Sequence, residues 1–174
     1  MNIFLIGYMA SGKTTFGEAL AKRLNRKFID LDQYIEKKTG ETISEIFAKE
    51  GHNGFRNIEK ENLLEIAKEE NAVIACGGGT PCFFDNMEFL NENGLTVFLA
   101  TSKPVLLRRL VELNHTRPLV AGKSESEIAS IIEEQLKTRL PFYEKAKIHW
   151  SGDLLESEEQ ISATVESFIS NNDL

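Results

Sequence analysis

The chain has 174 residues, of which 41% are hydrophobic and 27% are charged, proportions typical of a globular protein that buries a sizeable core. We expect a single domain over residues 1–174. The longest apolar runs hold only about five residues, too few to cross a membrane, and the N-terminus lacks a signal-type apolar segment. The two cysteines, Cys76 and Cys82, make neither a disulfide framework nor a zinc site, so we expect a cytoplasmic protein.

The formal net charge is −7, which argues against general binding to nucleic acid. It does not argue against an anionic small substrate. Charges farther apart than the Debye length, about 8 Å at physiological salt, are largely screened. A few arginines beside a ligand would therefore outweigh the distant acidic residues.

Short apolar runs alternate with helical patterns along the whole chain. We expect strands at 2–6, 27–29, 72–76, 96–100 and 147–150. The runs at 72–76 and 96–100 are apolar throughout, as expected for strands covered on both faces. Helices between successive strands imply right-handed crossovers, so the sequence predicts an α/β fold with a parallel sheet.

The first strand is followed at once by a phosphate-loop motif, Gly7-Tyr8-Met9-Ala10-Ser11-Gly12-Lys13-Thr14. Its two glycines allow backbone conformations that turn successive N–H groups toward a phosphate. Lys13 supplies a charge for the β- and γ-phosphates, and the Thr14 hydroxyl is a hard oxygen ligand for Mg²⁺. A helix beginning near Thr14 would add its positive end. Nucleotide binding is the prediction, and a fortuitous glycine-rich turn is the alternative.

Three helix starts carry a capping pattern, in which a small polar residue precedes an acidic or amide residue by three positions. The pairs are Thr42 with Glu45, Ser157 with Gln160 and, more loosely, Asp85 with Glu88. These are signals of fold, and no chemistry is assigned to them.

Asp30 and Asp32 follow the second strand, at the sheet edge where open α/β folds bind ligands. One of them could simply cap a helix over 33–38, which leaves the other unexplained. Two carboxylates beside a phosphate loop suit separate tasks. One orders water around Mg²⁺, and the other accepts a proton or hydrogen bond from a hydroxyl.

Three further features are candidates for an anion site. Arg56 stands near the start of a long helix, where an ordinary solvated charge is the alternative. Gly77-Gly78-Gly79 ends the third strand and suggests close approach of a ligand, although a flexible turn would look the same. Arg139 continues a predicted inward stripe, where a permanent charge needs an anionic ligand or an internal ion pair. Pro141 should end or kink that helix.

Residues 113–124 lack both helical and strand periodicity and include Arg117. Irregular stretches of this length inside a compact domain are often lids. Arg108 and Arg109 precede the stretch on a helix and could be a solvated face, and we interpret His115 as a surface residue.

Together these motifs resemble the shikimate kinase family over nearly the whole chain. The shared features occur in order: the phosphate loop, Asp30-x-Asp32, the stretch from Gly51 to Arg56, the three glycines, Thr116-Arg117-Pro118-Leu119, and Arg139-x-x-x-Tyr143. The resemblance implies a P-loop kinase fold of the nucleoside-monophosphate-kinase type, with a five-stranded parallel sheet and a mobile lid. It also implies transfer of the ATP γ-phosphoryl group to the 3-hydroxyl of shikimate, in the pathway to chorismate and aromatic amino acids.

The resemblance also implies roles for individual residues. Asp32 would hold the reacting hydroxyl and act as its base, and Asp30 would stand behind Mg²⁺ through water. Arg56 and Arg139 would bind the substrate carboxylate beside the glycine run, Arg117 would close onto the phosphates, and Arg109 would lie against the adenine. The implied ATP-binding set is Gly7, Ala10, Ser11, Gly12, Lys13, Thr14, Thr15, Arg109 and Arg117; the implied shikimate-binding set is Asp32, Arg56, Gly77, Gly78, Gly79 and Arg139.

Two other functions remain open at this stage. A related small-metabolite kinase, such as gluconate kinase, shares the loop and the fold, but a neutral polyol would not need Arg56 and Arg139 together with Asp32. A nucleotide-binding regulatory module without activity would not need Lys13 and Arg117 intact. We expect a monomer that binds ATP and shikimate and associates with neither nucleic acid nor a membrane.

Overall fold

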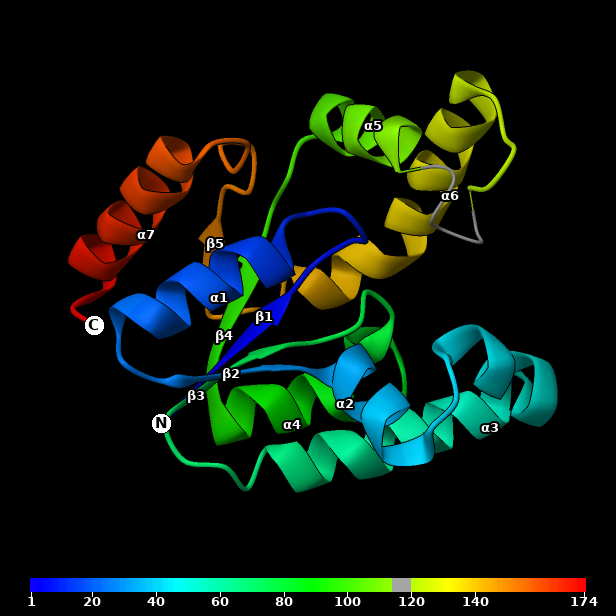
Figure 1. Ribbon diagram of the computed structural model, residues 1–174, viewed down its shortest axis with the longest axis horizontal. Coiled ribbons are helices and arrows are strands. Elements are labelled where there is room, and N and C mark those ends of the chain that lie inside the picture. The colour runs from blue at the N-terminus through cyan, green and yellow to red at the C-terminus, as the bar shows by residue number, and fades with distance from the viewer. Residues whose placement is uncertain (114–119) are drawn as a thin grey trace.

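The computed structural model describes residues 1–113 and 120–174 (Figure 1). Its centre is one sheet of five strands, all of them parallel, in the order β2-β3-β1-β4-β5. The strands are β1 (Asn2–Ile6), β2 (Lys27–Asp30), β3 (Ala72–Ala75), β4 (Gly94–Leu99) and β5 (Ile148–Trp150). All five predicted strands are confirmed, with bounds that shift by two residues at most.

Side chains of the central strand β1 alternate between two apolar cores, one on each face of the sheet. Ile3 and Leu5 pack with α1 (Lys13–Arg23) and α7 (Glu158–Asn172), which Figure 1 shows lying together on one side. Phe4 and Ile6 face the larger core on the other side. Burial on both faces also explains why β3 reads as a continuously apolar sequence.

The larger core is covered by helices on the second face of the sheet and at its carboxyl edge. These are α2 (Leu31–Thr39), α3 (Ile43–Ile66), α4 (Asn86–Asn93), α5 (Lys103–Glu112) and α6 (Glu125–Tyr143), with a short 3₁₀ helix η1 (Thr80–Cys82). No helix within the described ranges is long and apolar enough to cross a membrane.

The three capping predictions have different outcomes. Thr42 and Glu45 form a reciprocal capping box. Ser157 accepts a hydrogen bond from the Gln160 N–H, as predicted, but the Gln160 side chain accepts from the Glu156 N–H instead. The Asp85 prediction is wrong, because its side chain makes no cap bond and pairs with Lys60.

The helical segment that carries Arg56 starts close to the predicted place, just after a kink at Gly51, which has φ 70° and ψ −177°. Across that kink it is joined to an earlier segment that starts at Ile43, and the two together make up α3. Pro141, in contrast, does not end its helix. Helix α6 runs through Pro141 to Tyr143. A proline in the last turn removes only one backbone donor, and the Glu144 N–H still bonds to the Leu140 carbonyl.

Candidate active site

A cleft of about 920 Å³ opens at the carboxyl ends of β1, β2 and β3, with the phosphate loop along one side. Ligands of open α/β sheets bind at this edge. Gly7 and Gly12 have φ values of 145° and 96°, which residues with a Cβ rarely adopt. The predicted need for glycine at both positions is therefore confirmed.

Lys13 is the first residue of α1 and folds back across the loop. Its Nζ donates to the carbonyls of Gly7 and Tyr8, at 2.9 and 2.8 Å. Ser11 is buried within the loop, and Thr15 is exposed at the rim of the cleft. The ammonium group thus lies beside the curve of backbone where a phosphate chain would bind.

Asp30 has two structural tasks, one for each carboxylate oxygen. Its Oδ1 accepts from the backbone N–H groups of Asp32 and Gln33 and so caps α2. Its Oδ2 accepts from the Thr14 hydroxyl at 3.1 Å. The capping alternative was therefore correct for Asp30 and leaves Asp32 free for another role.

Thr14 and Asp30 together offer the hard oxygen atoms that Mg²⁺ prefers. Within the described residues no group of three or more His, Cys, Asp or Glu side chains could hold a metal ion alone. The pair fits an ion that takes most of its ligands from phosphate and water, as Mg²⁺ does at nucleotide sites.

Asp32 lies in the first turn of α2 and faces the glycine run. Burial raises the pKa of its carboxyl to about 6, and the charges of Asp30 and Glu59 add to the rise while Lys13 opposes it. Its Oδ1 lies 3.0 Å from the place where a Cβ on Gly77 would stand. A carboxyl with a pKa near neutrality, in a cleft beside a phosphate loop, suits proton transfer.

The three glycines lie against the other candidate side chains. A Cβ on Gly78 would stand 3.2 Å from an Arg139 nitrogen, and a Cβ on Gly79 would stand 2.6 Å from an Arg56 nitrogen. The run is packed rather than a loose turn. Its lack of side chains lets both guanidinium groups approach the backbone closely.

Arg56 is only partly accessible, with 11% of its side chain exposed, so the solvated alternative is wrong. Its NH1 donates to Glu59 at 2.7 Å, and Glu59 in turn accepts from the Thr80 hydroxyl at 2.6 Å. The buried Nε of Arg56 has no hydrogen-bond partner in residues 1–113 and 120–174. An unpaired donor of this kind is costly unless a ligand satisfies it.

Arg139 comes from α6 and reaches the same glycine run. It is half-buried, with its Cζ 5.5 Å from the Tyr8 ring. The described residues place no carboxylate within ion-pair distance of it, so the internal ion pair predicted as the alternative is not found. Tyr143, one turn further on, donates its hydroxyl hydrogen to the Gly78 carbonyl.

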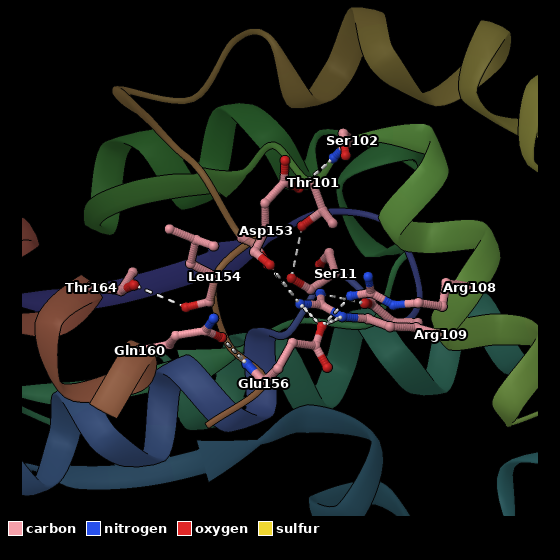
Figure 2. A network of polar contacts seen from close by, with 12 residues as sticks. Ser11, Thr101, Ser102, Arg108, Arg109, Asp153, Leu154, Glu156, Gln160 and Thr164 are labelled. Atoms are coloured by element: carbon pink, nitrogen blue, oxygen red, sulfur yellow. Dashed lines mark hydrogen bonds and ion pairs between the residues drawn. The ribbon is translucent and has the colours of Figure 1, made fainter. Parts of the chain in front are cut away.

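Arg109 ties the phosphate loop to the segment after β5, as Figure 2 shows. Its guanidinium donates to the Ala10 carbonyl at 3.1 Å, the Gly152 carbonyl at 3.0 Å and Glu156 at 2.9 Å. Arg108 is exposed, and its ion pair among the described residues is with Glu156. The solvated-face alternative is therefore right for Arg108 and wrong for Arg109.

A second link in the same network joins the loop to the end of β4. The Thr101 hydroxyl donates to the Ser11 carbonyl at 2.9 Å (Figure 2). Gly152 lies against the same carbonyl, since a Cβ there would stand 2.5 Å from the Ser11 oxygen and still closer to the Thr101 hydroxyl. The phosphate loop is thus supported from behind by residues far along the chain.

Arg117 and most of the predicted lid lie outside the described residues. In the described part of that range, 113 and 120–124, there is no helix or strand, and Val120 is buried. His115 also falls outside. These predictions stay predictions.

Sequence reasoning missed Glu59, Thr80 and Gly152. Glu59 could have been suspected, because it lies three residues after Arg56 and helical spacing brings such a pair together. Thr80 and Gly152 carried no comparable signal, since their roles depend on which distant backbone atom lies opposite.

A parallel sheet with a phosphate loop after its first strand, and a carboxyl and arginines facing that loop, defines a P-loop phosphotransferase. A sequence profile described as shikimate kinase matches residues 9–170. The chain belongs to the shikimate kinase family, and it is therefore a kinase.

Similar proteins support this assignment along the whole chain. The shikimate kinase of Phocaeicola vulgatus is 49% identical over 95% of this chain and 94% of its own. A crystal structure of the Bacteroides thetaiotaomicron enzyme matches with a TM-score of 0.97 and 45% identity, covering 100% of this chain and 99% of that one. The Acinetobacter baumannii enzyme, solved in complex with shikimate, matches with a TM-score of 0.84 and 35% identity over 98% and 94% of the two chains.

Proposed function

We propose that this cleft performs the reaction of its family, the ATP-dependent phosphorylation of shikimate, by transferring the γ-phosphoryl group to the 3-hydroxyl. The observation that carries the proposal is the pair of arginines at the glycine run. Arg56 has a buried unpaired Nε, and Arg139 has no carboxylate partner in the described residues. Two such cations beside a carboxyl with a raised pKa suit a substrate that has both a carboxylate and a hydroxyl.

At the phosphate end, the N–H groups of the loop and Lys13 would bind the β- and γ-phosphates. Thr14 would contact Mg²⁺ directly and Asp30 would hold one of its waters, in keeping with the hydrogen bond between the two side chains. The bound ion would neutralise charge on the phosphates. Phosphoryl transfer needs positioning and charge stabilisation rather than a covalent residue.

At the acceptor end, Asp32 would receive the proton of the 3-hydroxyl as that oxygen attacks the γ-phosphorus. Its pKa of about 6 leaves the carboxylate ionised at neutral pH yet basic enough to accept a hydrogen bond or a proton. Arg56 and Arg139 would hold the carboxylate at the far end of the ring. The hydroxyl would then be fixed between Asp32 and the phosphate loop.

Two assignments come from the family resemblance. Arg117 would close onto the phosphates with a lid over 113–124, and Arg109 would lie against the adenine. For Arg109 the support is its place on the cleft, between the loop and Gly152. The expectations of a cytoplasmic monomer without a nucleic-acid partner stay predictions.

The test is a coupled ADP-release assay with shikimate, shikimate methyl ester, quinate and gluconate side by side. Shikimate should be the preferred substrate. The methyl ester should have a KM about 10- to 150-fold higher, because it loses charge-assisted hydrogen bonds of about 1.5–3 kcal/mol. Equal use of ester and acid would contradict the assignment of Arg56 and Arg139 to the substrate carboxylate. Preference for gluconate would contradict the assignment of shikimate as the substrate.

A further inference from the structure

Three aromatic rings lie close to the Arg56 guanidinium. The Cζ of Arg56 lies 4.1 Å from the centroid of the Phe83 ring, 5.1 Å from that of Phe55 and 5.9 Å from that of Phe47. All three distances are within the range of cation–π attraction, and Phe83 is at stacking distance.

The polar contacts of Arg56 do not fix its plane alone. In the described residues its NH1 donates a hydrogen bond to Glu59, and one bond at one end leaves the guanidinium free to rotate about it. A bidentate contact with a carboxylate requires the plane to be set in advance. The flat ring of Phe83 supplies a surface that sets it.

The backbone around Phe83 is unusual for a residue that only fills space. Phe83 is extended, with φ −121° and ψ 147°, but the next residue, Phe84, has φ 53° and a side chain that is 54% exposed. A bulky residue in the left-handed region is strained. Strain of this kind persists where the surrounding structure imposes it, often at ligand sites.

The strained turn is fixed to the helix that carries Arg56. Lys60 forms an ion pair with Asp85 and lies 5.0 Å from the Phe84 ring. With the turn held in this way, the Phe84 side chain points outward and the Phe83 ring lies on the Arg56 guanidinium. Phe83 itself is half-buried, and within the described chain it belongs to neither apolar core.

We propose that Phe83 is a positioning residue for substrate recognition, which holds the Arg56 guanidinium plane ready for the substrate carboxylate. The proposal rests on the proposed function, in which Arg56 binds that carboxylate. Phe83 acts through Arg56 and touches no reacting atom. Loss of the ring should therefore weaken shikimate binding and leave the phosphate end unchanged.

The test compares Phe83→Leu with Phe83→Tyr, which keeps the ring face, and with Phe84→Leu, a matched loss of the neighbouring exposed ring. Phe83→Leu should raise the dissociation constant for shikimate about 3- to 30-fold, with ATP affinity unchanged. Phe83→Tyr and Phe84→Leu should stay within about twofold of wild type. If Phe83→Leu does not fold, Phe83→Met removes the ring at similar volume.

A double-mutant cycle separates this proposal from the proposed function. In an Arg56→Ala background, Phe83→Leu should cause no further loss of shikimate affinity, because its effect passes through Arg56. If Arg56→Ala leaves shikimate binding intact, the carboxylate site itself is wrong. If Arg56→Ala weakens binding but Phe83→Leu does not, or does so equally in both backgrounds, Phe83 has only a packing role.

Discussion

The two ends of the cleft are built in different ways. The phosphate end is one consecutive stretch, residues 7–15, of which 9, 10 and 12–15 line the cleft. The acceptor end consists of groups from four separate places: Asp32 on α2, Arg56 on α3, the backbone of the glycine run after β3, and Arg139 on α6. The phosphate end is therefore contiguous in sequence, whereas the acceptor end is assembled by the tertiary fold.

This difference has a functional consequence. Main-chain donors cannot be replaced by mutation, so apart from the Lys13 and Thr14 side chains the phosphate end can change only through the shape of its loop and the residues behind it. At the acceptor end, each contact belongs to one side chain. We therefore expect acceptor variants to separate shikimate binding from ATP binding, and variants behind the loop to affect the nucleotide first.

The largest separation should come from Asp32→Asn. The amide cannot accept the hydroxyl proton, and general bases contribute about 10²–10⁴-fold, so turnover should fall by that factor. ATP affinity, measured by titration, should stay within about twofold, since in the proposed mechanism Asp32 contacts the acceptor hydroxyl and not the nucleotide. Turnover within about threefold of wild type would show that Asp32 is not a general base. Loss of ATP affinity would show that the phosphate and acceptor ends of the cleft are coupled.

The next largest effect should come from the arginines. Arg139→Ala should weaken shikimate binding about 10- to 150-fold, because a charge-assisted contact is worth about 1.5–3 kcal/mol. Arg56→Lys should be nearly as damaged as Arg56→Ala, since lysine lacks the planar fork. Isothermal titration with each substrate measures both effects. Intact shikimate binding in Arg139→Ala would place the carboxylate elsewhere.

Gly152→Ala tests the opposite end. A Cβ there would press on the Ser11 carbonyl and the Thr101 hydroxyl, and overpacking of this kind costs about 1–3 kcal/mol. We expect the melting temperature to fall by about 3–10 °C and the KM for ATP to rise, while the KM for shikimate changes less. Ser151→Ala, at the exposed neighbouring position, is the control. A selective loss of shikimate affinity in Gly152→Ala would contradict the idea that residues behind the loop act on the nucleotide end of the cleft.

The smallest effect concerns pH. The folded pKa of Asp32, about 6, is above its ordinary value of 3.8. Between these values the folded state binds more protons than the unfolded state, so this group lowers stability as pH rises from about 4 to 6. Above pH 6 the penalty is fully present. Turnover requires the ionised form and should therefore fall as pH drops below about 6.

Asp32→Asn should remove that penalty. The variant should melt at a higher temperature than wild type at pH 8, and the difference should shrink toward pH 4. Circular dichroism melts at the two pH values measure this. A difference that is the same at both values would mean that the carboxyl is not perturbed in the folded protein.

The same contrast explains what the sequence could predict. Strands buried on both faces appear as short apolar runs, and the phosphate loop is contiguous, so both were recognised. Glu59, Gly152 and Phe83 were missed because their roles depend on neighbours distant in the chain, such as Thr101 for Gly152. Arg56 and Arg139 stand 83 positions apart, and only the family resemblance linked them before the fold did. The helix starting at Thr42 and the helix carrying Arg56 were not recognised as one element, because Gly51 kinks the chain without ending the helix.

The central position of β1 also has a consequence for synthesis. Its two neighbours are β3 and β4, and 65 residues separate Ile6 from Ala72. At about 5–20 residues per second, the ribosome needs roughly 3–13 s to make that interval. Throughout it, β1 has no strand to pair with and leaves an apolar edge exposed. We expect nascent chains halted before Ala72 to be cleaved rapidly by protease and to bind chaperones, and chains halted well beyond Leu99 to resist.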